Sequence, residues 1–109
     1  MIARTWHARA TLDKADAYAA HFTSAVVPAL KQLAGHRSAF LMRREIDGGV
    51  EFVALTLWES RASIEAFAGT DIGRAHVERE GRTALSSFDD FATHYEVAFT
   101  SVDAAGTCP

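Results

Sequence analysis

The sequence predicts an α+β fold, in which a four-stranded antiparallel sheet carries helices on one face. Segments with strand and helix periodicity follow one another as strand, helix, strand, strand, helix, strand. The strand pattern over residues 50–57 stops at Trp58-Glu59-Ser60 and gives way at once to a helical pattern over residues 61–68. The third strand is apolar on both parities, which predicts a sheet covered on both faces.

Residues 2–11 form the first expected strand. Ile2 and Trp6 share one parity with the small residues Ala8 and Ala10, which is typical of a central strand between packed layers.

A long helix is expected next, ending at Gly35, a residue suited to a helix C-terminus. Its apolar residues recur at steps of three and four: Ala15, Tyr18, Ala19, Phe22, Val26, Leu30 and Leu33. Pro28 lies inside this pattern, where it removes one hydrogen bond and crowds the carbonyl of Ser24. We therefore expect a kink over residues 23–27.

A hairpin of two strands follows, over residues 36–46 and 50–57. The turn between them is Asp-Gly-Gly at residues 47–49, where glycines supply positive φ without steric cost. Ser60 offers a hydroxyl as the cap of the second helix.

The last third of the chain is expected to hold a short helix ending at Val77, a break at Gly81 and a fourth strand over residues 94–102. Residues 83–91 suit either a helical turn or a packed loop. The whole order is the ferredoxin-like βαββαβ arrangement.

Both faces of this sheet need cover. On the third strand, one parity (Val53, Leu55, Leu57) is as apolar as the other (Phe52, Ala54, Trp58). A second copy packed sheet to sheet would cover the face without helices, so we expect a homodimer.

Composition indicates one domain, residues 1–102, with a flexible C-terminal tail over residues 103–109. The formal charge is −3 and the basic residues are scattered, so nucleic acid is not an expected partner. Apolar runs are too short for a membrane span and no signal pattern begins the chain, which favours a cytoplasmic location. The single cysteine, Cys108, excludes an internal disulfide and a cysteine-based metal site.

The series of strand, Trp58-Glu59-Ser60 and helix resembles the antibiotic biosynthesis monooxygenase-like family, whose members are small dimeric α+β barrels. The segment from His94 to Val97 is similar to the last strand of uncharacterised members. The resemblance implies pairing into a dimeric barrel. In cofactor-free monooxygenases of that family, the tryptophan works with an asparagine four residues earlier and a tyrosine six residues later. Here these positions hold Ala54 and Ile64, so both polar partners are missing.

Trp58 is the first candidate for ligand binding, because a strand-end indole would roof a cavity between sheet and helices. A purely structural ring is the alternative. His7 and His94 lie on neighbouring strands, so one of them could face the cavity as a base or could be a hydrogen-bonded core residue. Arg79 could bind a carboxylate by a forked hydrogen bond or could lie in a solvated charge run.

A resemblance to haem-degrading members of the superfamily supplies further candidates. His76 falls near their histidine, Phe67 stands where they have a tryptophan, and Trp6-His7 stands where they have an asparagine. A neutral imidazole at His76 could bind iron or move protons, or could lie exposed on the surface.

The leading hypothesis is a cofactor-independent monooxygenase for a hydrophobic aromatic metabolite, without a metal. Its base would be His76, His7 or His94, and its pocket would use Trp58, Trp6, Phe67 and Arg79. The alternatives are a non-catalytic ligand-binding dimer and, third, a haem-degrading enzyme.

Overall fold

The computed structural model describes residues 1–101. Its elements are, in chain order, β1 (Ile2–Thr11), α1 (Leu12–His21), the π-helical segment η1 (Phe22–Val26), α2 (Val27–Lys31), β2 (His36–Ile46), β3 (Gly49–Trp58), α3 (Arg61–Ala68), α4 (Arg79–Ala84), β4 (Ser87–Phe88) and β5 (Thr93–Glu96). This order confirms the α+β prediction. β5 corresponds to the expected fourth strand, and the short strand β4 lies within residues 83–91, where a helical turn or a packed loop was expected. The fourth strand expected over residues 94–102 is too long, because β5 ends at Glu96 and residues 97–101 are not in a strand. The expected tail, with Cys108, lies outside the described residues.

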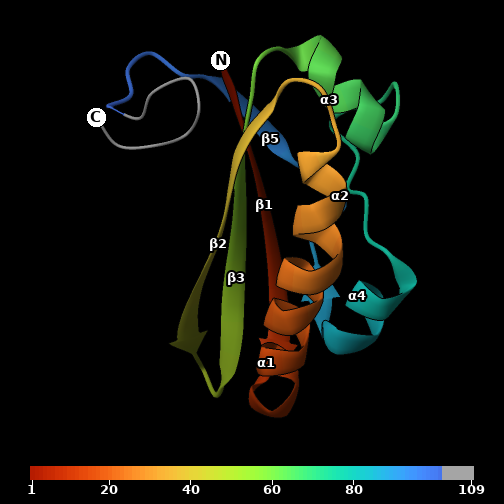
Figure 1. Ribbon diagram of the computed structural model, residues 1–109. Coiled ribbons are helices and arrows are strands. Elements are labelled where there is room, and N and C mark those ends of the chain that lie inside the picture. The colour runs from red at the N-terminus through yellow and green to blue at the C-terminus, as the bar shows by residue number, and fades with distance from the viewer. Residues whose placement is uncertain (102–109) are drawn as a thin grey trace.

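The sheet is antiparallel, with strand order β2-β3-β1-β4, and β5 also pairs with β1. β1 and β3 are therefore the central strands. The helices lie on one side of this sheet, and within residues 1–101 the other side carries none (Figure 1). The predicted placement of helices on one face is confirmed.

The hairpin between β2 and β3 turns through Asp47 and Gly48, both of which have positive φ (49° and 77°). Such a two-residue turn matches the twist of the flanking strands. Ser60 caps the N-terminus of α3: its Oγ accepts a hydrogen bond from the Ser63 N–H at 3.2 Å, while Ser63 Oγ accepts from the Ser60 N–H at 3.2 Å. The predicted cap is therefore present as a reciprocal capping box.

The helical run over residues 12–31 is irregular where the sequence predicts a kink. In η1 the backbone hydrogen bonds join residues five apart instead of four, and the Val27 N–H donates to the Phe22 carbonyl. Pro28, which follows directly, has no N–H for the Ser24 carbonyl. A π-helical turn accommodates this missing donor without ending the helix, and Tyr18 before it and Leu30 after it are both buried.

Two expectations for the last third are wrong. Residues 69–78 are not helical, because the backbone there bonds to residues 90–92: the Ala75 N–H donates to Asp90 O at 2.8 Å, and the Ala92 N–H donates to Gly73 O at 2.7 Å. Gly81 does not break the chain but lies buried inside α4. An added Cβ there would lie 3.4 Å from the His21 ring, so the glycine lets α4 pack closely on α1.

Alternate residues of the central strands face the helices and form the core. Residues 2, 4, 6, 8 and 10 of β1 are all buried, as are residues 50, 52, 54, 56 and 58 of β3. The opposite parity forms what we call the open face, whose apolar members are Ala3, Phe40, Met42, Ile46, Val53, Leu55, Leu57 and Tyr95. Of these, Phe40, Met42 and Tyr95 are 43%, 48% and 56% exposed. The prediction that the sheet has a second apolar face is confirmed.

Candidate functional site

A narrow cavity lies between the helix side of the sheet, the α1–α2 run and the segment that leads into α4. Its volume is about 50 Å³, and the whole empty space of the cavity together with its solvent-open mouth is about 590 Å³. Its walls are largely apolar, with a small set of polar side chains: Arg4, Tyr18, His21, Thr56, His76 and Glu78. A mostly apolar cavity with a few convergent polar groups is the usual form of a small-molecule site.

Tyr18 lines the cavity from α1 and is 4% exposed. Its ring packs on Phe52 of β3, with ring centres 5.1 Å apart. Burial raises the pKa of the Tyr18 phenol to about 12. The hydroxyl therefore stays protonated at neutral pH and can donate a hydrogen bond.

His21 and Glu78 approach each other at the cavity wall, with Nε2 and the carboxylate oxygen 3.9 Å apart. The His21 side chain is only 12% exposed, whereas that of Glu78 is 41% exposed. The pair thus places an imidazole and a carboxylate side by side at the cavity wall, which is the geometry of a base and the group that orients it.

Phe67 and His76 form a second part of the wall. The His76 ring meets Phe67 edge-on, with centres 5.3 Å apart and planes at 72°. His76 is exposed as a whole residue, yet it also lines the cavity. An imidazole in this position can exchange protons with both solvent and a bound ligand.

Arg4 is the one charged residue among the buried residues of the described chain, at 6% exposed. A terminal nitrogen donates to the Arg74 carbonyl at 3.1 Å, and the guanidinium carbon lies 5.4 Å from the centre of the Phe67 ring. Burial lowers the pKa of Arg4 to about 10, so the group remains a cation at neutral pH. Its Nε has no hydrogen-bond partner among residues 1–101.

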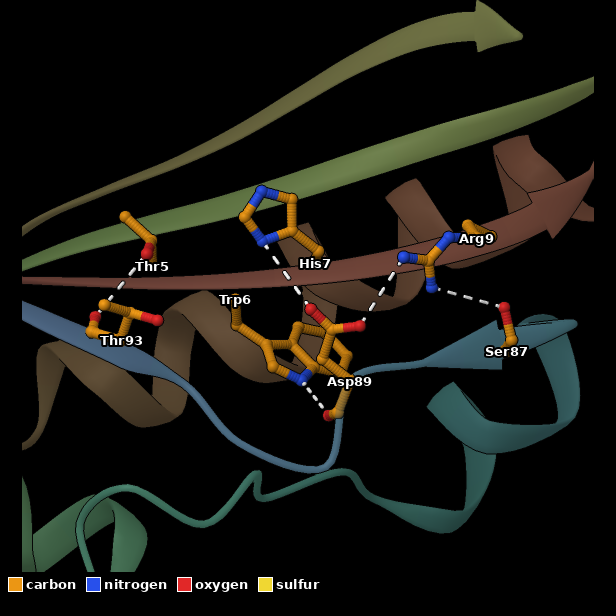
Figure 2. A network of polar contacts seen from close by, with 7 residues as sticks. All are labelled: Thr5, Trp6, His7, Arg9, Ser87, Asp89 and Thr93. Carbon is orange, nitrogen blue, oxygen red and sulfur yellow. Dashed lines mark hydrogen bonds and ion pairs between the residues drawn. The ribbon is translucent and has the colours of Figure 1, made fainter.

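Trp6 lines the cavity, and Asp89 fixes its position. The indole N–H donates to the Asp89 carbonyl oxygen at 2.7 Å (Figure 2). The Asp89 side chain turns the other way, toward His7 at 3.8 Å and Arg9 at 3.5 Å. Trp6 therefore presents a ring to the cavity while its polar N–H is already bonded.

The structure places His7, Trp58 and Arg79 away from the cavity. His7 pairs with Val53 on β3 and shares its open face, opposite to the cavity. Arg79 is exposed in the first turn of α4. The position predicted for Trp58 is wrong. Trp58 is 0% exposed and packs with Ile2, Leu30 and Ile64 in a separate core cluster. Its N–H donates to Thr56 Oγ1 at 2.8 Å, and Trp58 is not among the residues that line the cavity.

His94 has the helix-facing parity of β5, opposite Arg4 in the register, but it does not line the cavity. Its Nε2 is buried without a hydrogen-bond partner in the described chain. Burial lowers the pKa of His94, and the charges of Arg4 and Arg61 lower it further.

His94 is therefore neutral in the folded protein at neutral pH, and the free energy of unfolding depends on pH as a result. The unfolded chain takes up a proton near the ordinary value of 6.5 while the folded chain does not, so stability falls as pH drops below that value. Unfolding in urea between about pH 7.5 and 5.0 should show this loss. His94→Gln should reduce it, leaving the part due to His36, whose pKa is also lowered by burial. An unchanged pH dependence in the variant would contradict this assignment.

Sequence reasoning missed five polar residues of the cavity: Arg4, Tyr18, His21, Thr56 and Glu78. One signal was available for Arg4. It lies on the parity of β1 that also holds Ile2 and Trp6, so the alternation places a charged side chain on the buried face. For Glu78 there was no such signal, because the path of residues 69–78 depends on tertiary contacts.

Together, the ferredoxin-like sheet and its helices define a small α+β protein with a mostly apolar cavity between them. The family model described as antibiotic biosynthesis monooxygenase matches residues 1–79. The chain belongs to this family. No curated protein matches the chain at a significant level.

Solved structures agree on the fold. A Bacillus cereus crystal structure, described as a candidate antibiotic biosynthesis monooxygenase, superposes with a TM-score of 0.65 at 15% identity, covering 92% of this chain and 94% of that one. Among residues 1–101, no helix is long and apolar enough to cross a membrane.

Proposed function

We propose that the chain is a small cofactor-independent monooxygenase for a hydrophobic aromatic substrate, with the cavity as its active site. In such a reaction the deprotonated substrate supplies the electrons. Dioxygen converts a ring CH₂ to a carbonyl, with one oxygen atom kept and the other released as water. The protein must supply a base, an apolar pocket and hydrogen bonds to the developing anion.

One observation carries the proposal: imidazoles and hydrogen-bond donors converge on an otherwise apolar cavity. His76 and the pair of His21 with Glu78 can accept the substrate proton. Trp6 and Phe67 provide aromatic walls, and the neutral Tyr18 phenol can donate to an oxygen of the substrate. The roles of His7 and Arg79 as base and ligand contact gain no support, because neither lines the cavity.

We propose further that a second copy covers the open face, giving the paired-sheet dimer that the sequence predicts. The support is the apolar, half-exposed surface of Phe40, Met42 and Tyr95, together with Val53 and Leu55 between them. Faces of this kind on small proteins are typically interfaces. The test of the dimer is given in the Discussion.

The enzymatic proposal is tested by oxygen uptake with 1,8-dihydroxyanthrone, an electron-rich aromatic with an acidic CH₂. We expect uptake above the spontaneous rate, and the double variant His21→Ala/His76→Ala should lose on the order of 100-fold in kcat, as for removal of a general base. Glu65→Ala, an exposed change on α3, is the matched control and should keep full activity.

Two results would go against the proposal. If the double variant consumes oxygen as fast as the wild type, neither histidine is the base. An anthrone that binds but is recovered unchanged after incubation in air would favour the alternative, a non-catalytic ligand-binding protein.

A further inference from the structure

We propose that the cavity takes its ligand as an aromatic oxyanion, a phenolate, enolate or carboxylate held by the Arg4 guanidinium. The inference rests on the proposed function only in treating this cavity as the ligand site. It adds the charge of the ligand and the residue that selects it.

The first step in the argument is that Arg4 is a buried cation without a counter-charge. It is 6% exposed, and none of the ion pairs among residues 1–101 includes it. Burying an unpaired charge is costly, so such a group is retained where something pairs with it. The cavity is where that partner can bind, since Arg4 lines it.

The second step concerns hydrogen-bond donors. A guanidinium has five N–H groups in a planar fork, suited to a carboxylate or a ring oxyanion. In the described chain, Arg4 uses one terminal nitrogen on the Arg74 carbonyl, and its Nε is buried without a partner. Donors therefore remain for a ligand oxygen.

The third step is the charge of the surroundings. His94 on β5 stays neutral because its pKa is lowered, and the Tyr18 phenol stays neutral because its pKa is raised. Glu78, the one carboxylate that lines the cavity, is 41% exposed and lies beside His21. The interior next to Arg4 is therefore positive at neutral pH and favours an anion.

Phe67 then explains why the anion should be aromatic. Its ring lies against the Arg4 guanidinium and continues the apolar wall of the cavity. A flat ligand can place its oxygen on Arg4 and its ring among Phe67, Trp6 and Phe22.

The test is a binding titration with 4-nitrophenol, whose anion is yellow, and with 4-nitroanisole, its neutral methyl ether. The wild-type protein should bind the anion more tightly than the ether and should lower the apparent pKa of the bound phenol, which appears as a gain in yellow absorbance at fixed pH. Arg4→Met should weaken anion binding by roughly 10- to 100-fold, remove the gain in absorbance and leave ether binding within about twofold.

Controls separate Arg4 from general electrostatics and from misfolding. Arg74→Met removes an exposed cation outside the cavity and should leave anion binding within about twofold. Arg4→Met should also melt a few degrees higher than the wild type without ligand, because it removes an unpaired buried charge.

Equal wild-type affinity for anion and ether, no binding of the anion at millimolar concentration, or full anion binding by Arg4→Met would each overturn the inference. Failure of oxygen uptake with anion binding intact would count against the proposed function alone.

Discussion

Replacing Gly35 with alanine is expected to destabilise the protein by about 2–4 kcal/mol, more than any other single methyl group added to a glycine of the described chain. Gly35 joins the helical run to β2 with φ of +85°, a conformation that favours glycine. A Cβ at this position would lie 2.4 Å from Ser63 Cβ and 2.9 Å from Ser63 Oγ. Ser63 cannot give way cheaply, because its hydroxyl belongs to the capping box of α3.

The matched control is Gly69→Ala. Gly69 has nearly the same φ, +81°, but an added Cβ there meets nothing within 4 Å. That variant should lose only the free energy of backbone strain, about 1–3 kcal/mol, because φ of +81° with ψ of −174° is a conformation that is essentially restricted to glycine. Denaturation in urea measures both. Equal losses in the two variants would show that the approach of Gly35 to Ser63 adds nothing to the strain of positive φ.

A charge at the centre of the open face is expected to abolish the proposed dimer. Leu55 of β3 lies between Thr5 of β1 and Phe40 of β2 in the register, so Leu55→Asp places a carboxylate in the middle of the apolar surface. A two-fold interface buries this charge twice. We expect the dissociation constant to rise by more than about 100-fold, since an unpaired buried charge costs several kcal/mol.

Native mass spectrometry and analytical ultracentrifugation measure this effect directly. The wild type should have twice the mass of one chain and Leu55→Asp the mass of one. Ala62→Asp, an exposed change in the first turn of α3, is the matched control and should remain dimeric. A monomeric wild type, or a dimeric Leu55→Asp, would remove the paired-sheet proposal.

Local patterns predicted most of the fold because local physics determines it. The alternation of apolar residues gave β1, β2 and β3 within a residue of their ends, and the Ser60 cap gave the start of α3. The irregularity before Pro28 followed from its missing N–H. Each of these features depends on residues close together in the chain.

Predictions failed where distant contacts decide the outcome. Gly81 was interpreted as a helix breaker, but its missing side chain instead makes room for the His21 ring. Trp58 was expected at a cavity because strand-end aromatics often line one, and only packing against α2 and α3 shows that it is core. Arg4 was overlooked because its neighbours in the cavity are brought together by tertiary structure, from α1, α3 and the segment before α4.

The π-helical turn η1 holds one residue more than an α-helical turn would at this place in the helical run. Each residue of an α-helix is rotated by about 100° from the one before it. A side chain four residues further on is therefore displaced by about 40° around the helix axis. Tyr18, Phe22, Val26 and Leu30 keep that spacing over three steps, yet all four line the cavity. The wider turn offsets this displacement. Deleting one residue of η1 would turn Tyr18 and His21 by about 100° relative to Leu30. The extra residue of η1 thus keeps Tyr18 and Leu30 on the same side of the helical run, where both line the cavity.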